Sequence, residues 1–173
     1  MKSLLLLFGL VPEDTHCPLE VLLLMFSAVH PHADATLMHI RKWLRILIDR
    51  SLLLGTVDRP SVHDLVLDFA VGQHTAADLQ AKHRSVVEAF RVARPADLHG
   101  RRGFNQTGIL DGLTRYVCHE VQYHVRKGSA AQDEYVTTHW LGDVPMDEIV
   151  LCVGVGLGLE QLSLLAHRAE DSG

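Results

Sequence analysis

The sequence VHDLVLDF at residues 62–69 decides how the first half of this chain is interpreted. It places a histidine–aspartate pair, His63 and Asp64, at the start of an apolar segment, directly after the turn-forming residues GTVDRP at 55–60. Short apolar runs on both sides of such turn residues predict a β-hairpin. Asp64 is then expected to cap the first turn of the following helix. An exposed imidazole at His63 could donate a hydrogen bond to a phosphate.

Upstream of the hairpin, apolar residues recur at three- and four-residue intervals, the spacing of one face of an α-helix. The residues that follow this spacing are Leu37, Ile40, Leu44, Leu47 and Ile48. The expected order of elements is therefore helix, short strand, turn and short strand. This order is that of a winged helix, in which the second strand of the wing leads into the next helix.

Four segments between residues 5 and about 90 follow one another in a recognisable order: LVPED at 10–14, PLEVLLLMF at 18–26, LIDRSLL at 47–53 and VHDLVLDF at 62–69. They resemble the FPED opening, first helix, LVDRSLL segment and MHDL sensor motif of a known subdomain. It is the winged-helix subdomain of NB-ARC (STAND, NLR-like) nucleotide switches, the family of plant resistance proteins and apoptosome-forming ATPases. Valine replaces the usual methionine at Val62, which remains an apolar packing residue.

The resemblance implies a role in signal transduction, including defence responses. In such proteins the motif histidine contacts the phosphate of bound ADP and helps to hold the closed, inactive arrangement, and exchange for ATP releases it. By position, His63 would be the nucleotide sensor and Asp64 the carboxylate that fixes its tautomer and orientation. The chain has 12 histidines, and the other interpretation of His63 is an ordinary surface or core residue.

Composition limits the range of partners. The chain has 173 residues, of which 47% are apolar, and a formal net charge of −5. This is enough apolar material for one domain or two small ones, but the charge does not favour a nucleic-acid partner. The basic residues that come nearest to a cluster are Arg41, Lys42, Arg45 and Arg50, with Arg101 and Arg102 later in the chain. A solvated helix face accounts for the first four better than a DNA-binding surface.

After the hairpin the sequence predicts further helices. One covers residues 75–93, with Thr75 as its N-cap and Pro95 after its end, and another covers 109–125. The apolar residues at helical spacing are Leu79, Val86, Val87, Phe90 and Val92 in the first helix, and Leu110, Leu113, Tyr116, Val117, Val121 and Val125 in the second. We therefore expect a mainly α fold, with a winged-helix subdomain at 1–73 and a helical extension at 74–173. A last segment at 145–168 contains GVGLG, which lacks the lysine and hydroxyl residue of a P-loop.

The sequence predicts neither an enzyme nor a metal site. A STAND ATPase needs a P-loop and acidic residues that hold magnesium, and neither motif is recognisable here.

The three cysteines are far apart, which favours a reducing, cytoplasmic setting. His30 and His32 flank a proline and are expected in a solvated turn. The leucine run at 4–7 lacks a signal-peptide cleavage site, and no apolar run approaches the roughly 20 residues of a membrane span.

Two functions of different class remain open. The first is a regulatory module of a nucleotide-dependent signalling switch, in which ADP or ATP is bound only together with a nucleotide-binding domain of the same or a partner chain. The second is a stand-alone winged-helix domain for DNA binding or protein interaction, with the helix at 37–50 in the major groove. The acidic net charge and the apolar face of that helix favour the first function.

Overall fold

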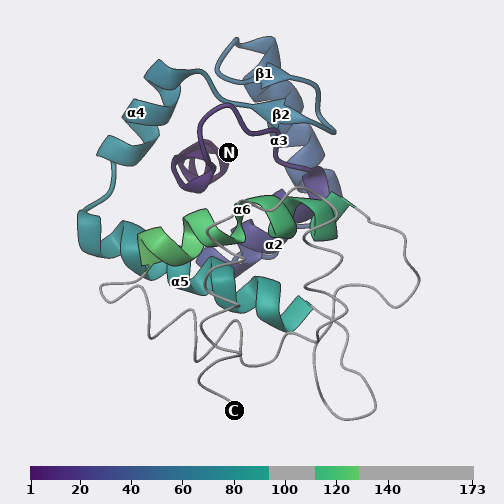
Figure 1. Ribbon diagram of the computed structural model, residues 1–173. Helices are drawn as coiled ribbons and strands as arrows, with labels where there is room; N and C mark the ends of the chain where they lie inside the picture. The colour runs from purple at the N-terminus through teal and green to yellow at the C-terminus, as the bar shows by residue number, and fades with distance from the viewer. Residues whose placement is uncertain (94–111, 129–173) are drawn as a thin grey trace, which may run out of the picture.

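The computed structural model describes residues 1–93 and 112–128, and Figure 1 shows that they form helices with one small sheet. In chain order the elements are α1 (Lys2–Leu7), the 3-10 helix η1 (Phe8–Leu10), α2 (Leu19–Val29), α3 (Leu37–Asp49), β1 (Leu54–Gly55), β2 (Pro60–Ser61), α4 (Asp64–Gly72), α5 (Ala76–Ala93) and α6 (Gly112–Gly128). The prediction of a mainly α fold with a small β-hairpin is confirmed.

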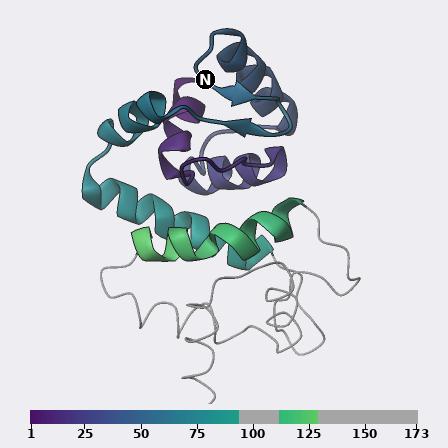
Figure 2. The ribbon, with the colours of Figure 1, turned by 45° about the horizontal axis from the view of Figure 1, so that its top comes forward.

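The helices share one core. Figure 2 shows α5 and α6 side by side at the bottom of the described part, with α2 directly above them. α5 packs against both α6 and α2, α3 packs against α2, and α4 packs against η1 and α1. One hydrophobic cluster includes buried residues from α1, η1, α2, α3, α5 and α6. The elements before and after the predicted subdomain boundary at 73/74 therefore bury their apolar faces together.

The apolar faces predicted from helical spacing are mostly buried. On α3, Ile40, Leu44 and Leu47 are at most 2% exposed. The buried residues predicted on α5 and α6 are Val86, Val87, Phe90, Tyr116, Val117, Val121 and Val125. Two predicted core residues are wrong, because Leu37 and Val92 are 41% and 52% exposed. They are the first residue of α3 and the second-last residue of α5.

The hairpin is short and is tied to the rest of the molecule at two points. Its strands pair antiparallel, with Gly55 opposite Pro60. Cys17 N–H donates to the Pro60 carbonyl at 3.2 Å, which joins the hairpin to the loop before α2. Arg41 on α3 forms an exposed ion pair with Asp58 at 2.6 Å. These contacts hold the turn of the hairpin close to α3 and to the start of α2.

The limits of α5 agree with the sequence analysis. Thr75 Oγ1 accepts a hydrogen bond from Asp78 N–H at 3.1 Å, so Thr75 caps the helix as predicted. α5 ends at Ala93, two residues before Pro95, and α6 covers most of the helix predicted at 109–125. The last segment at 145–168 and the arginine pair at 101–102 lie outside the described residues.

Gly55 lets the chain turn between the two strands. Its φ is +80°, a conformation that L side chains rarely adopt, and a Cβ there would overlap the Arg59 carbonyl. Replacing Gly55 with alanine is therefore expected to destabilise the fold by about 1 to 3 kcal/mol, measured by urea denaturation. Gly72→Ala is the matched control, because a Cβ at Gly72 meets nothing within 4 Å. Equal effects of the two substitutions would contradict a strained turn.

Candidate functional site

His63 lies at the point where the hairpin leads into α4. It is the N-cap residue of α4, and its Nδ1 accepts a hydrogen bond from Leu65 N–H at 3.3 Å. A neutral imidazole whose Nδ1 accepts carries its proton on Nε2. The side chain is exposed, as predicted. The local structure therefore fixes both the tautomer and the orientation of His63 and leaves its Nε2–H as a donor.

The prediction that Asp64 caps α4 is wrong. Asp64 is the first residue of the helix, and the imidazole of His63 takes the capping role that a carboxylate usually has. The group that orients the His63 ring is the Leu65 amide, and no bond joins Asp64 to this ring. A carboxylate in the first turn still interacts favourably with the positive end of the helix dipole. Ligand binding by His63 and Asp64 stays a prediction.

The face of α4 next to His63 carries apolar side chains that the described residues do not cover. Leu65 and Phe69 are 74% and 51% exposed and lie one helical turn apart. The opposite face packs close to η1 through Ala70, whose backbone lies 3.1 Å from the place a Cβ would take at Gly9. Neighbouring exposed apolar residues are typical of a surface that binds another protein.

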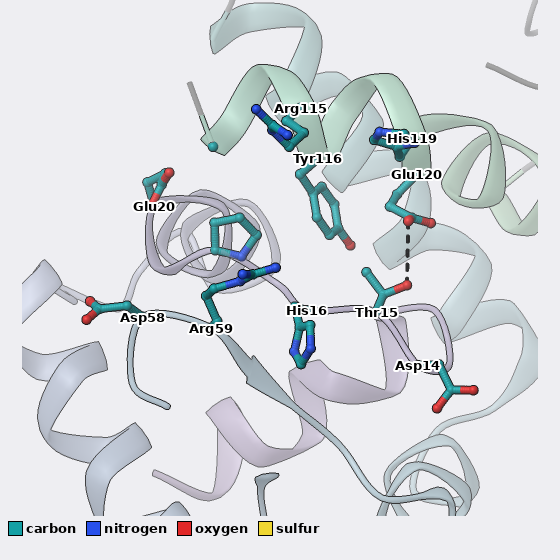
Figure 3. Close-up of a pocket in the computed structure, with 12 residues that line it drawn as sticks. Asp14, Thr15, His16, Glu20, Asp58, Arg59, Arg115, Tyr116, His119 and Glu120 are labelled. Carbon is teal, nitrogen blue, oxygen red and sulfur yellow. Dashed lines mark hydrogen bonds between the residues drawn. The ribbon is translucent and has the colours of Figure 1, made fainter. Parts of the chain in front are cut away.

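A pocket of about 550 Å³ lies between three segments that are distant in the sequence. The lining comes from residues 14–16 and Pro18 before α2 together with Glu20 in its first turn, from the hairpin turn, and from the first half of α6. Figure 3 shows Tyr116 and Glu120 extending from α6 toward the side where Arg59 and His16 lie, with Arg115 and His119 also on α6. Thr15 Oγ1 donates to the Glu120 carboxylate at 3.5 Å, and burial raises the pKa of Glu120. Nothing in the sequence spacing pointed to this pocket.

A buried chain of polar side chains connects α5, α6 and the loop before α2. His83 Nδ1 and His124 Nδ1 lie 3.0 Å apart, and His124 Nε2 lies 3.3 Å from the Tyr116 hydroxyl. The hydroxyl also lies close enough to the Cys17 thiol for each group to influence the pKa of the other. If the Tyr116 proton points to Cys17, His124 Nε2–H donates to Tyr116 and His83 Nδ1–H donates to His124. Both ring nitrogens of His124 then have a partner while both histidines stay neutral.

Burial controls the protonation of this chain. Desolvation lowers the pKa of His83 to about 4, with Lys127 adding to the effect, and it lowers the pKa of His124 well below its usual value. Burial likewise raises the pKa of Tyr116 and of the Cys17 thiol, so neither ionises near neutral pH. A buried neutral thiol is not an activated nucleophile.

The two buried histidines were missed by sequence reasoning, although a signal for them existed. His83 lies four residues after Leu79 and four before Val87, and His124 lies three residues after Val121. Both therefore occupy the apolar face of their helix. By contrast, His32 is exposed in the turn between α2 and α3, and His30 packs on Phe26 with ring centroids 4.8 Å apart.

The histidine pair should make stability depend on pH. A pKa lowered from 6.5 to about 4 on folding means that the unfolded chain binds the proton more readily than the folded one. The stability from a neutral His83 is therefore complete above pH 6.5 and is lost as the pH falls toward 4, by about 3 kcal/mol at pH 4.

Denaturation in urea across this pH range measures the effect. His83→Gln retains a hydrogen-bonding group that does not titrate and should flatten the pH dependence. The exposed His32→Gln serves as the control and should keep the slope of the native chain. If the unfolding free energy of His83→Gln depended on pH as steeply as that of the native chain, other groups would be the cause of the loss of stability.

Comparisons with known proteins add no relative. No family model, curated protein or solved structure matches this chain. Among the described residues, no helix is both long and apolar enough to cross a membrane, and no group of three or more His, Cys, Asp or Glu residues could hold a metal ion. Any functional assignment therefore depends on the residues and geometry of the chain itself.

Proposed function

We propose that this chain is the winged-helix and helical module of an NB-ARC-type nucleotide switch, in which His63 senses bound ADP. The observation that carries the proposal is the geometry of His63. Its Nδ1 is held by Leu65 N–H, so its Nε2–H is free to donate to a ligand at the start of α4. The sequence context, a hairpin followed directly by the HDL residues of the motif, supports the same function.

The start of α4 suits a phosphate oxygen for two reasons. Backbone N–H groups of a first helical turn and the positive end of the helix dipole attract anions. The His63 Nε2–H adds a directional hydrogen bond whose proton is already on the correct nitrogen. A phosphate bound there would therefore need no change of tautomer or of ring orientation at His63.

The site needs a second domain to bind nucleotide. In the proposed switch, a nucleotide-binding domain of the same or a partner chain supplies the P-loop and the magnesium ligands, and this chain performs no catalysis alone. Leu65 and Phe69 support this arrangement, because they leave an apolar surface on α4 beside His63. We propose that the nucleotide-binding domain covers this surface in the ADP-bound state.

The packing of the module suggests how a signal would spread. α4 contacts η1 and α1. Three residues connect α4 to α5, which packs on α2 and α6. When His63 loses the phosphate, α4 and the hairpin would move relative to α5 and α6, because α4 contributes only partly buried residues to the hydrophobic cluster in which α5 and α6 are buried.

Nucleotide affinity in a protein that joins this chain to its nucleotide-binding domain tests the proposal. We compare native His63 with His63→Ser, since serine retains a good N-cap but cannot reach the phosphate. Loss of a hydrogen bond to a charged group should weaken ADP binding at least about tenfold in calorimetry, with ATP binding little changed.

The exposed His32→Ser is the control and should bind both nucleotides as the native protein does. Unchanged ADP affinity in His63→Ser would remove His63 from the site. Salt-dependent binding of duplex DNA by this chain alone would favour a DNA-binding winged helix instead.

A further inference from the structure

Two arginines in the pocket of Figure 3 have no acidic partner among the residues that the structure describes. Arg59 comes from the turn of the hairpin and Arg115 from α6, and both side chains line the pocket. Neither side chain forms an ion pair or a hydrogen bond with the described residues. An arginine keeps its charge at any pH a protein meets. The pocket therefore contains two fixed positive charges that the surrounding residues do not neutralise directly.

The carboxylates around the pocket interact elsewhere. Asp58 pairs with Arg41 on α3 at 2.6 Å, and Glu120 accepts a hydrogen bond from Thr15. Glu20 lies against the first residue of α6, where the helix dipole stabilises a negative charge. Figure 3 shows the remaining carboxylate, that of Asp14, directed away from both arginines.

Two histidines of the lining can also donate hydrogen bonds. His16 and His119 are exposed at the pocket and present ring nitrogens, and Tyr116 forms part of the wall. The volume of about 550 Å³ falls within the range of sites for small organic molecules. A phosphomonoester carries a charge of about −1.5 to −2 at neutral pH, which matches two arginines, and guanidinium groups bind phosphate oxygens through paired hydrogen bonds.

We propose that this pocket binds a small phosphomonoester, with Arg59 and Arg115 as its principal ligands. The site shares no lining residue with the proposed nucleotide sensor, so it does not depend on that function. The two arginines belong to segments more than 50 positions apart in the sequence, and the docking of α6 brings them to one cavity. A ligand held by both would join α6 to the hairpin and stabilise the docked helix.

Calorimetry on the complete chain tests the site, with inorganic phosphate and glycerol phosphate as probes. We expect saturable binding of glycerol phosphate with a Kd of about 1 mM or lower, weakened by added salt. Arg59→Gln and Arg115→Gln should each raise the Kd at least about tenfold. Arg45→Gln makes the same change of charge on the exposed surface of α3, outside the pocket, and should leave the Kd unchanged.

Circular dichroism and the melting temperature of each variant show whether it is folded, and glycerol phosphate should raise the Tm of the native chain more than that of the pocket variants. Absence of saturable binding up to about 10 mM would overturn the proposal. The same holds if Arg45→Gln loses affinity as much as the pocket variants, since the ligand would then respond only to net charge. Tighter binding of citrate than of glycerol phosphate would assign the pocket to carboxylates and overturn the phosphate class.

Discussion

The packing of α5 between α2 and α6 is the interaction on which the rest of the structure depends. Val86, Val87 and Phe90 are at most 2% exposed, and they belong to the same hydrophobic cluster as the buried residues of α1, α2 and α3. The Phe90 ring also meets the edges of Tyr116 and His124 on α6, with centroids 6.0 and 5.6 Å away. Without this contact α6 would lose its apolar partner, and the pocket between α6 and the hairpin would lose one wall.

The same contact explains why two histidines can be buried at little cost. An unpartnered polar group in a core is expensive, but His83 and His124 satisfy each other, and Tyr116 satisfies the second nitrogen of His124. The hydrogen bonds have direction, so they fix the register of α6 against α5 more narrowly than apolar packing alone would. The α5–α6 interface thus combines a non-directional apolar seam with one specific polar contact.

The sequence predicted those features that depend on local order. Helical spacing identified α3, α5 and α6 and most of their buried residues, and the turn residues between two apolar runs identified the hairpin. It failed where the outcome depends on which of two neighbours meets a backbone group, as at the start of α4, where His63 rather than Asp64 is the cap. It also could not show that Arg59 and Arg115 line one pocket, because only the docking of α6 brings the two together.

Strand β2 connects the two proposed sites. His63 follows β2, while Arg59 lies in the turn just before β2, so only three residues lie between the proposed nucleotide sensor and the nearer arginine of the proposed anion pocket. A displacement of α4 that moved β2 would also move Arg59 relative to Arg115, because Arg115 is held on α6 by the contact with α5. An anion that bridges the two arginines would resist that displacement, and by thermodynamic linkage the displacement would weaken anion binding to the same degree. Coupling of this kind needs no contact between the two ligands, because β2 connects the two sites.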